Sequence, residues 1–256
     1  MVPAQRPSVQ YPVTEGVGWD ERLSTMHRAR FGFVIVLAIA GLVGLSGCQN
    51  DPNQAVRISD VTVTDAQIEA IAQRFAADLA AHNPQFKDPV GQVRQSVAEL
   101  TVFNELARRY ASEKGIELPT PDYEATAAQY GAPADDPFVR LNAETSAYLT
   151  ALRDHATPRE PTESDVQDVY RRYKELAGAD AQPYDVVKQA LKDVPEYPLA
   201  LGLRSDLLAA LDRYGLSVNP RYQPLNIPLL AVSQGQLVLV DLPMGDQGTG
   251  AVRDVS

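Results

Sequence analysis

The chain of 256 residues contains one cysteine and three histidines. The single cysteine, Cys48, excludes an internal disulfide, so the fold must be stabilised by a packed core. The histidines, His27, His82 and His155, are far apart, whereas a metal site needs several ligands at suitable spacing. His82 and His155 each lie near a proline at an expected helix end, where an imidazole commonly contacts terminal carbonyl groups. The sequence therefore predicts no metal site.

The signatures of common enzyme classes are also missing. There is no Gly-rich phosphate loop and no Gly-x-Ser-x-Gly motif. Carboxylates are numerous, but Asp135 and Asp136, like Glu163, Asp165 and Asp168, lie at expected helix starts, where negative charge favours the helix dipole and caps free amides. We expect a protein without enzymatic activity and without a cofactor. A hydrolase that uses a buried carboxylate pair is the open alternative.

Basic residues are in the minority. The chain has 33 acidic and 23 basic residues, a formal net charge of −10. Binding to nucleic acid depends on clustered basic residues, so nucleic acid is not an expected partner. The same charge disfavours a basic surface that adheres to anionic lipid, so any membrane attachment must come from another source.

The first 47 residues have the organisation of a targeting segment. Residues 1–25 show no sustained apolar period, and we interpret them as a disordered or spurious extension. Met26–Arg30 is basic, and residues 31–45 contain no charged side chain. This pattern over residues 26–47 predicts a signal peptide. A permanent transmembrane helix is the weaker alternative, because about 20 apolar residues are needed to cross a bilayer.

The signal peptide ends in a short motif. Leu45, Ser46 and Gly47 precede Cys48, and this segment resembles the bacterial lipobox. The resemblance implies that Cys48 becomes the lipid-bearing first residue of the mature chain. Such a lipid would anchor the protein to the extracytoplasmic face of the cell membrane. The alternative is a stray thiol close to a signal sequence.

The remainder predicts a short tether and one helical domain over residues 55–242. Residues 48–54 are polar, as a tether between a lipid and a fold should be. Val56–Val63 has the alternation of a strand, a turn and a second strand. Thr64 can cap a helix because Gln67 follows three residues later. Helices are expected over about 64–82, from Pro89 to Gly115, and over 122–130, 137–155, 162–176 and 184–214, the last interrupted near Pro195 and Pro198.

The C-terminal part returns to strands. Leu225–Leu230 and Gln236–Val240 predict a hairpin whose prolines keep its first strand at a sheet edge. We expect this hairpin to pair with Val56–Val63, so that the two ends of the mature chain form a small antiparallel sheet beside the helices. Residues 243–256 predict a flexible tail. The expected fold class is therefore mostly α.

The order of these elements resembles the N-terminal chaperone region of SurA and PrsA-type foldases. The resemblance is carried by the capped start near Val56, by Tyr110–Pro119 (YASEKGIELP) and by Thr162–Tyr170 (TESDVQDVY). Tyr214–Tyr222 (YGLSVNPRY) is similar to the closing stretch of SurA-N-like lipoproteins of high-GC Gram-positive bacteria. The resemblance covers about residues 55–242 and implies a helical chaperone module.

The resemblance also implies what this module does. In the foldases a parvulin-type prolyl isomerase lies between the helix that resembles 162–176 and the next one, but here only Ala177–Gln182 joins them. We therefore expect a holdase for unfolded exported polypeptides without isomerase activity. The alternative is a scaffold lipoprotein that docks one cell-envelope partner. The client-binding residues stay unknown at this point: tyrosines spread over the helices suit a peptide groove, although core packing is their default role.

Overall fold

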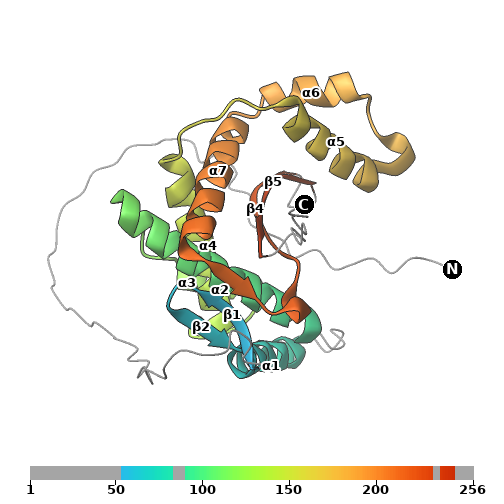
Figure 1. The fold of residues 1–256 in the computed structure, drawn as a ribbon. Coiled ribbons are helices and arrows are strands. Elements are labelled where there is room, and N and C mark those ends of the chain that lie inside the picture. Colours follow the sequence, from blue (N-terminus) through green and yellow to red (C-terminus); the bar gives the residue numbers. More distant parts are fainter. Residues whose placement is uncertain (1–52, 83–89, 233–236, 246–256) are drawn as a thin grey trace, which may run out of the picture.

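The computed structural model describes residues 53–82, 90–232 and 237–245 (Figure 1). The predicted extension, signal peptide and lipobox, with Cys48 and most of the tether, lie outside these residues. Within the described residues, no helix has the length and apolar character needed to span a bilayer.

A three-stranded antiparallel sheet joins the start of the domain to its later part. Strand β1 (Gln54–Ile58) lies in the middle, between β2 (Val61–Thr64) and β3 (Leu216–Val218). Val56 is paired with Val63 on one side and with Val218 on the other. The predicted strand, turn and strand are confirmed. The third strand, however, comes from the segment after the last helix.

Helices α1 (Asp65–His82) and α2 (Val90–Lys114) follow. The predicted cap of α1 is confirmed: the Gln67 amide N–H donates to the Thr64 hydroxyl, and the Thr64 N–H donates to the Gln67 side chain. Helix α2 is the centre of the domain because apolar residues along most of its length are buried. Gly115 ends it with a φ of 67°, a left-handed conformation that favours glycine.

Helices α3 (Tyr123–Tyr130) and α4 (Pro137–Asp154) pack beside α1 and α2. The Asp122 and Asp136 carboxylates cap their N-termini, and the cap by Asp136 was predicted from its position. Buried Asn104 fixes α2 against α4, since its Nδ2 donates to the Leu141 carbonyl at 3.0 Å and its Oδ1 accepts from the Thr145 hydroxyl at 2.8 Å. This pairing satisfies a polar group inside the core.

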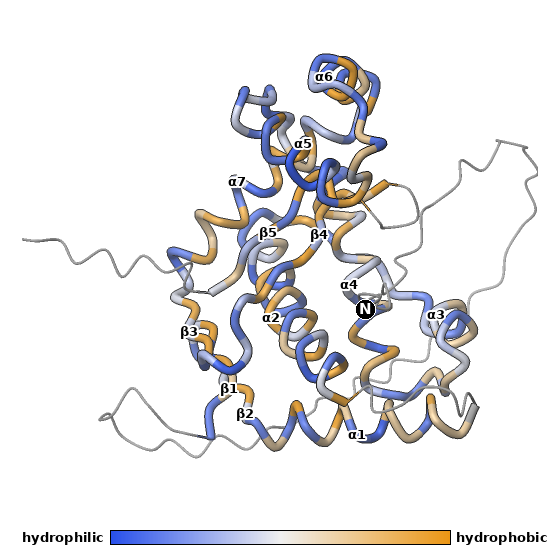
Figure 2. The backbone as a smooth tube through the Cα atoms, turned by 90° about the vertical axis from the view of Figure 1, so that its right-hand side faces the viewer, coloured by the Kyte–Doolittle hydropathy of each residue, from blue (hydrophilic) through white to orange (hydrophobic). Residues whose placement is uncertain are grey.

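Two further helices form an arm at the end of the molecule opposite α1 (Figures 1 and 2). Helix α5 (Glu163–Ala177) continues into the 3-10 turn Gly178–Asp180 and is followed by α6 (Tyr184–Lys192). Thr162 and Asp165 form the capping box of α5. The arm is short because only Gly178–Pro183 joins the two helices.

Helix α7 (Glu196–Tyr214) returns from the arm to the body. The predicted interruption of the 184–214 stretch is confirmed, because α6 ends at Lys192 and α7 begins after Pro195. The segment leading into α5 crosses α7 at Gly202. A Cβ placed on Gly202 would lie 1.8 Å from the Thr157 carbonyl oxygen, so no larger residue fits this crossing.

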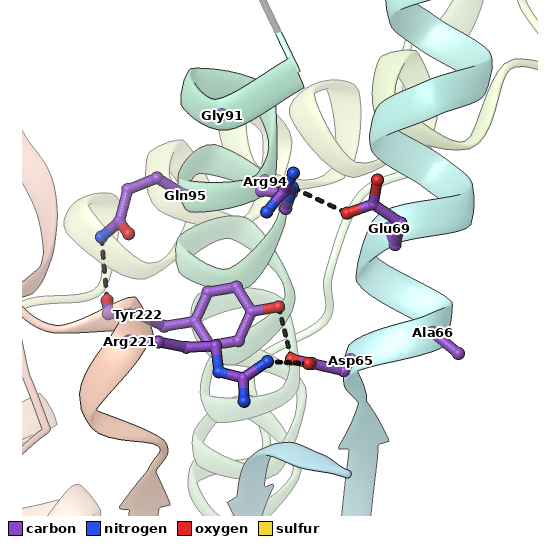
Figure 3. Close-up of a pocket in the computed structure, with 8 residues that line it drawn as sticks. All are labelled: Asp65, Ala66, Glu69, Gly91, Arg94, Gln95, Arg221 and Tyr222. Atoms are coloured by element: carbon purple, nitrogen blue, oxygen red, sulfur yellow. Dashed lines mark hydrogen bonds and ion pairs between the residues drawn. The ribbon is translucent and has the colours of Figure 1, made fainter.

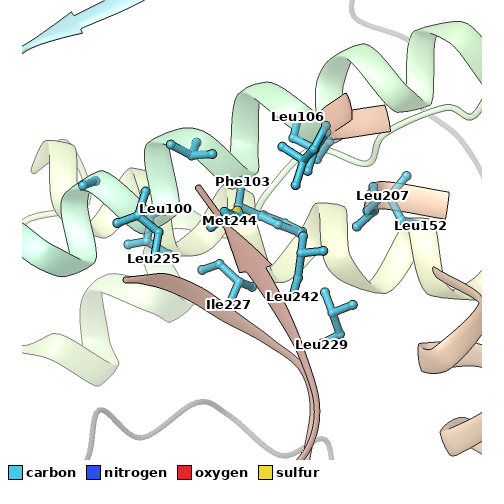
Figure 4. Packing of buried hydrophobic residues seen from close by; sticks show 14 of the residues in the cluster. Leu100, Phe103, Leu106, Leu152, Leu207, Leu225, Ile227, Leu229, Leu242 and Met244 are labelled. Atoms are coloured by element: carbon cyan, nitrogen blue, oxygen red, sulfur yellow. The ribbon is translucent and has the colours of Figure 1, made fainter. Parts of the chain in front are cut away.

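The C-terminal hairpin forms a separate two-stranded sheet of β4 (Leu225–Val232) and β5 (Leu237–Met244). The hairpin is confirmed, but its predicted pairing with Val56–Val63 is wrong. Its apolar face packs against α2 and α7, and the free edge of β1 is occupied by β3. Figure 4 shows this core, with Leu225, Ile227, Leu229, Leu242 and Met244 of the hairpin beside Leu100, Phe103 and Leu106 of α2.

The boundary of the predicted tail is also corrected. Pro243 and Met244 belong to β5, where they pair with Asn226 and Leu225. Met244 is buried in the core, which explains why the strand extends past the proline. The coarse prediction of a mostly helical domain with small antiparallel sheets is confirmed.

Candidate functional site

His155 and the carboxylates singled out in the sequence have structural contacts. Nδ1 of His155 lies 2.8 Å from the Ala151 carbonyl oxygen at the end of α4, as a terminal histidine should. The Asp136 carboxylate accepts from the amides of Phe138 and Val139. Asp165 accepts from Thr162 and Arg159. Within the described residues, no three histidine, cysteine, aspartate or glutamate side chains gather where they could hold a metal ion.

The other three carboxylates of this group are ion-paired. Asp135 pairs with Arg74, and Asp168 pairs with Arg171. Glu163 pairs with Lys188, which ties α5 to α6. These contacts stabilise helix starts and helix pairs, and they do not bring the five carboxylates together at one site.

Most of the tyrosines serve packing and fixed pairs. Tyr110, Tyr197 and Tyr222 are buried. Several hydroxyl groups donate to carboxylates on other elements: Tyr110 to Asp206, Tyr123 to Glu144, Tyr184 to Glu163, Tyr214 to Glu113 and Tyr222 to Asp65. Burial, together with the neighbouring Asp65 carboxylate, raises the pKa of Tyr222 to about 12, so this hydroxyl stays a hydrogen-bond donor.

A first pocket, of about 400 Å³, lies between α1, α2 and the 3-10 turn Pro220–Tyr222 (Figure 3). The Glu69 carboxylate faces Nε of Arg94 at 2.7 Å, and Asp65 accepts from Arg221 and from the Tyr222 hydroxyl. Its charges therefore neutralise one another. We assign this pocket a structural role, since the contacts of Asp65 with Arg221 and Tyr222 join the C-terminal segment to α1.

The Asn219-Pro220-Arg221 turn fixes the C-terminal segment to the N-terminal part of the domain. Its Asn219 N–H donates to the Ala55 carbonyl at 2.8 Å, and the side chain donates to the Gln54 carbonyl at 3.2 Å. Arg221 pairs with Asp65 at the start of α1. The turn therefore holds the C-terminal segment against β1 and α1.

The larger hollow is a groove of about 590 Å³ between the helices and strand β4. One wall comes from α3 and α4, and the other comes from β4 and the junction between α6 and α7. Polar and apolar groups alternate along the α4 wall. Its α4 residues include Ser146, Leu149, Thr150 and Arg153, and its β4 residues are Ile227, Pro228, Leu229, Leu230, Ala231 and Val232.

Tyr130 and Asn142 form the floor of this groove, and hydrogen bonds and ring contacts hold them in place. The Tyr130 hydroxyl donates to Oδ1 of Asn142 at 3.0 Å, and the Asn142 amide donates to the Phe138 carbonyl at 2.9 Å. The Tyr130 ring also contacts Phe75 and Phe138 edge-on. These contacts satisfy the polar groups at the floor and fix the position of α3 against α4.

Three charged side chains line the groove: Asp122 caps α3 through the Ala125 N–H, whereas Arg153 and Glu196 have no side-chain partner within the described residues. Arg153 is half-buried and Glu196 is exposed. This contrasts with the first pocket, where each carboxylate has a partner. The groove is therefore the better candidate for binding something outside the chain.

The sequence did not identify this site. Its walls are far apart in the chain, from Pro119 to Val232, and most of its residues are small or uncharged. The one available signal was Pro228, which predicted that β4 has an unpaired edge. Comparisons of the chain with protein-family models, with curated protein sequences and with solved structures give no match.

Proposed function

We propose that this protein is a membrane-anchored extracytoplasmic lipoprotein that holds segments of unfolded exported polypeptides without a chemical step. The groove beside β4 is the observation that carries the proposal. It is open, it has a mixed polar and apolar lining, and its volume of about 590 Å³ is large enough for a few side chains of a bound segment.

The anchoring part of the proposal rests on the sequence. A basic start, an apolar stretch and the Leu45-Ser46-Gly47-Cys48 motif together favour cleavage before Cys48 and lipidation of its thiol. The described domain begins a few residues later, at the polar end of the tether. A groove on this domain would therefore face the space outside the membrane.

The proposal includes no prolyl isomerase activity. Helix α5 ends at Ala177 and α6 begins at Tyr184, with a 3-10 turn between them. The resemblance to SurA and PrsA-type foldases places the isomerase at this junction, and so short a link supports a holding function alone. The identity of the chain as a SurA-N-like lipoprotein is part of the same proposal.

Suppression of aggregation tests the holding function. The purified full chain in detergent micelles should suppress aggregation of an unrelated, thermally unfolding protein at about equal molar amounts and without added nucleotide. Empty micelles and an acidic protein of similar size are the controls. If the full chain at severalfold excess does no more than these controls, the holding function is wrong.

A scaffold that docks one cell-envelope partner is the second candidate. It is favoured by the arm, where Leu176 and Val186 are 52% and 51% exposed. Leu176 on α5 and Val186 on α6 would offer apolar contacts to one fixed partner. Crosslinking in intact cells would then recover one partner, and Leu176→Ser with Val186→Ser would remove it, while aggregation of unrelated proteins would be unaffected by the chain.

A further inference from the structure

Within the described residues, the edge of β4 that lines the groove is not paired with another strand. In the two-stranded sheet, β4 pairs with β5 on one side. At its start, the Asn226 N–H donates to the Glu99 carboxylate at 3.3 Å. From Ile227 to Val232, no residue outside the hairpin forms a hydrogen bond with the strand in the part of the chain that the structure describes.

The shape of the groove shows that this edge is part of its wall. Successive residues of a strand point to opposite faces of a sheet, yet the whole run Ile227–Val232 lines the hollow. Ile227 and Leu229 are each 1% exposed because their side chains face the core. A hollow that is lined by residues from both faces of β4 must run along the edge of this strand.

The two walls have the length of a short strand. Six residues of β4 extend over about 20 Å at the rise of a β-strand. The stretch of α4 from Asn142 to Arg153 extends over about 17 Å at the rise of a helix. An extended segment of five or so residues therefore matches the length of both walls.

The charge in the α4 wall specifies the occupant further. The Arg153 guanidinium is half-buried and has no ion pair within the described residues, so a carboxylate on the bound segment would complement it. Glu196 lines the same groove and has no partner within the described residues, and Asp122 lines it as the cap of α3. These two carboxylates limit the attraction to a single acidic group placed at Arg153, because further acidic groups would be repelled.

We propose that the groove binds an extended polypeptide segment that adds to the β4 edge as a strand and places one acidic side chain against Arg153. The proposal rests on the proposed holding function and names its site and preferred segment. Main-chain hydrogen bonds to a strand edge give affinity without regard to sequence, and here they come from residues other than Pro228, which has no N–H to donate. The single charged contact adds a preference among otherwise similar segments.

Capped peptides test this proposal on the full chain. The probes are fluorescent peptides of about ten residues, alternating apolar residues and serine, acetylated and amidated at their ends, with Glu, Gln or Lys at one central position. The Glu peptide should bind about tenfold more tightly than the Gln peptide. Arg153→Ala should remove this difference, and Arg153→Glu should make the Lys peptide the preferred one. Arg57→Ala, at an exposed position of β1 outside the groove, is the matched control and should change nothing.

A second pair of variants tests the location. Ser146→Trp fills the groove from α4 and should abolish binding of all three peptides, whereas Ser205→Trp, at an exposed position of α7 outside the groove, should leave it unchanged. N-methylation of alternate peptide amides should also abolish binding if the segment adds as a strand. Circular dichroism and thermal unfolding establish that each variant is folded.

The outcomes separate this proposal from the holding function. Unchanged peptide binding by folded Ser146→Trp, or equal binding of the Glu and Gln peptides to the unmodified chain, overturns the proposal. If aggregation is still suppressed in that case, holding takes place elsewhere on the molecule. If the unmodified chain neither binds peptide nor suppresses aggregation, the proposed function itself is wrong.

Discussion

Glu99 is a carboxyl group in an unusual environment. It lies on α2, partly buried, where its Oε1 accepts from Nε2 of Gln95 at 3.2 Å and from the Asn226 N–H at 3.3 Å. Burial raises its pKa to about 7, although both hydrogen bonds act in the opposite direction. The folded state therefore holds a proton at Glu99 at pH values where the unfolded chain has released it.

This pKa predicts the direction of a pH effect. Between about pH 4.5 and pH 7 the folded state binds more protons at Glu99 than the unfolded state, so the free energy of unfolding falls as the pH rises through this window. The loss should be at most about 3 kcal/mol by pH 8, since one pKa unit corresponds to 1.36 kcal/mol. Chemical denaturation at pH 5 and pH 8 measures it.

Glu99→Gln should reduce that pH dependence. A neutral amide keeps an acceptor for Gln95 and Asn226 and has no proton to lose, so the variant should be more stable than the original chain at pH 8 and similar to it at pH 5. Glu117→Gln, at an exposed position, is the matched control and should retain the full pH dependence. Equal pH dependence in the Glu99 variant and the original chain would show that another group is responsible.

Cys48 is the residue on which the anchoring proposal depends. Cys48→Ser should yield an unprocessed precursor or a soluble protein without attached lipid, because the thioether requires a thiol. Mass spectrometry and detergent partitioning measure this, with Ser46→Ala as a control that keeps the small residue before the cleavage site. Diacylglycerol still attached to the serine variant would contradict the lipoprotein proposal. Membrane retention without lipid would instead identify residues 31–45 as the anchor.

At the scale of elements, local chemistry made the helix boundaries predictable. Thr64 with Gln67 and Thr162 with Asp165 begin helices, and Gly115 ends one, because each satisfies backbone groups within a few residues. The break before α7 follows from prolines that cannot continue a helix. Such signals act over short distances and do not depend on the rest of the fold.

The placement of the hairpin could not be predicted in the same way. Alternation in Leu225–Val232 indicates a strand with one buried face, but it does not specify whether that face packs on a sheet or on helices. The β1 edge that seemed available is paired with Leu216–Val218, a run of three residues too short to show a pattern. The groove could not be predicted for the same reason, because it lies between β4 and α4 and depends on how the hairpin is placed against the helices.

The crossing at Gly202 gives a prediction for one element contact. Gly202→Ala should lower the free energy of unfolding by about 3 kcal/mol, because its Cβ would overlap the Thr157 carbonyl and force the segment before α5 away from α7. Thermal or urea unfolding measures the change. Gly91→Ala is the matched control: among the described residues nothing lies within 4 Å of a Cβ there, and alanine should be neutral or slightly stabilising in α2. Equal effects of the two substitutions would contradict the close crossing.

At the scale of the whole molecule, net charge separates the two candidate functions. With a formal charge of −10, the surface has no general attraction for polypeptides other than basic ones. Client holding through an extended groove should therefore persist from low salt to about 0.5 M salt, where the Debye length is a few ångströms. Aggregation assays with an acidic and a basic client across this range measure it. Suppression confined to the basic client, or lost at moderate salt, would favour the scaffold.

If the chain is exported as proposed, the pairing of β1 with β3 has a consequence for the order of events. The middle strand of the N-terminal sheet finds its second neighbour only after α7, so the sheet closes across nearly the whole domain. Contacts between residues so distant in the chain form slowly, because a long loop must close first. A chain that emerges N-terminus first would thus present Cys48 to the processing enzymes before β1 has paired with β3. On the proposed route, anchoring precedes folding, and the domain completes its fold already tethered to the membrane.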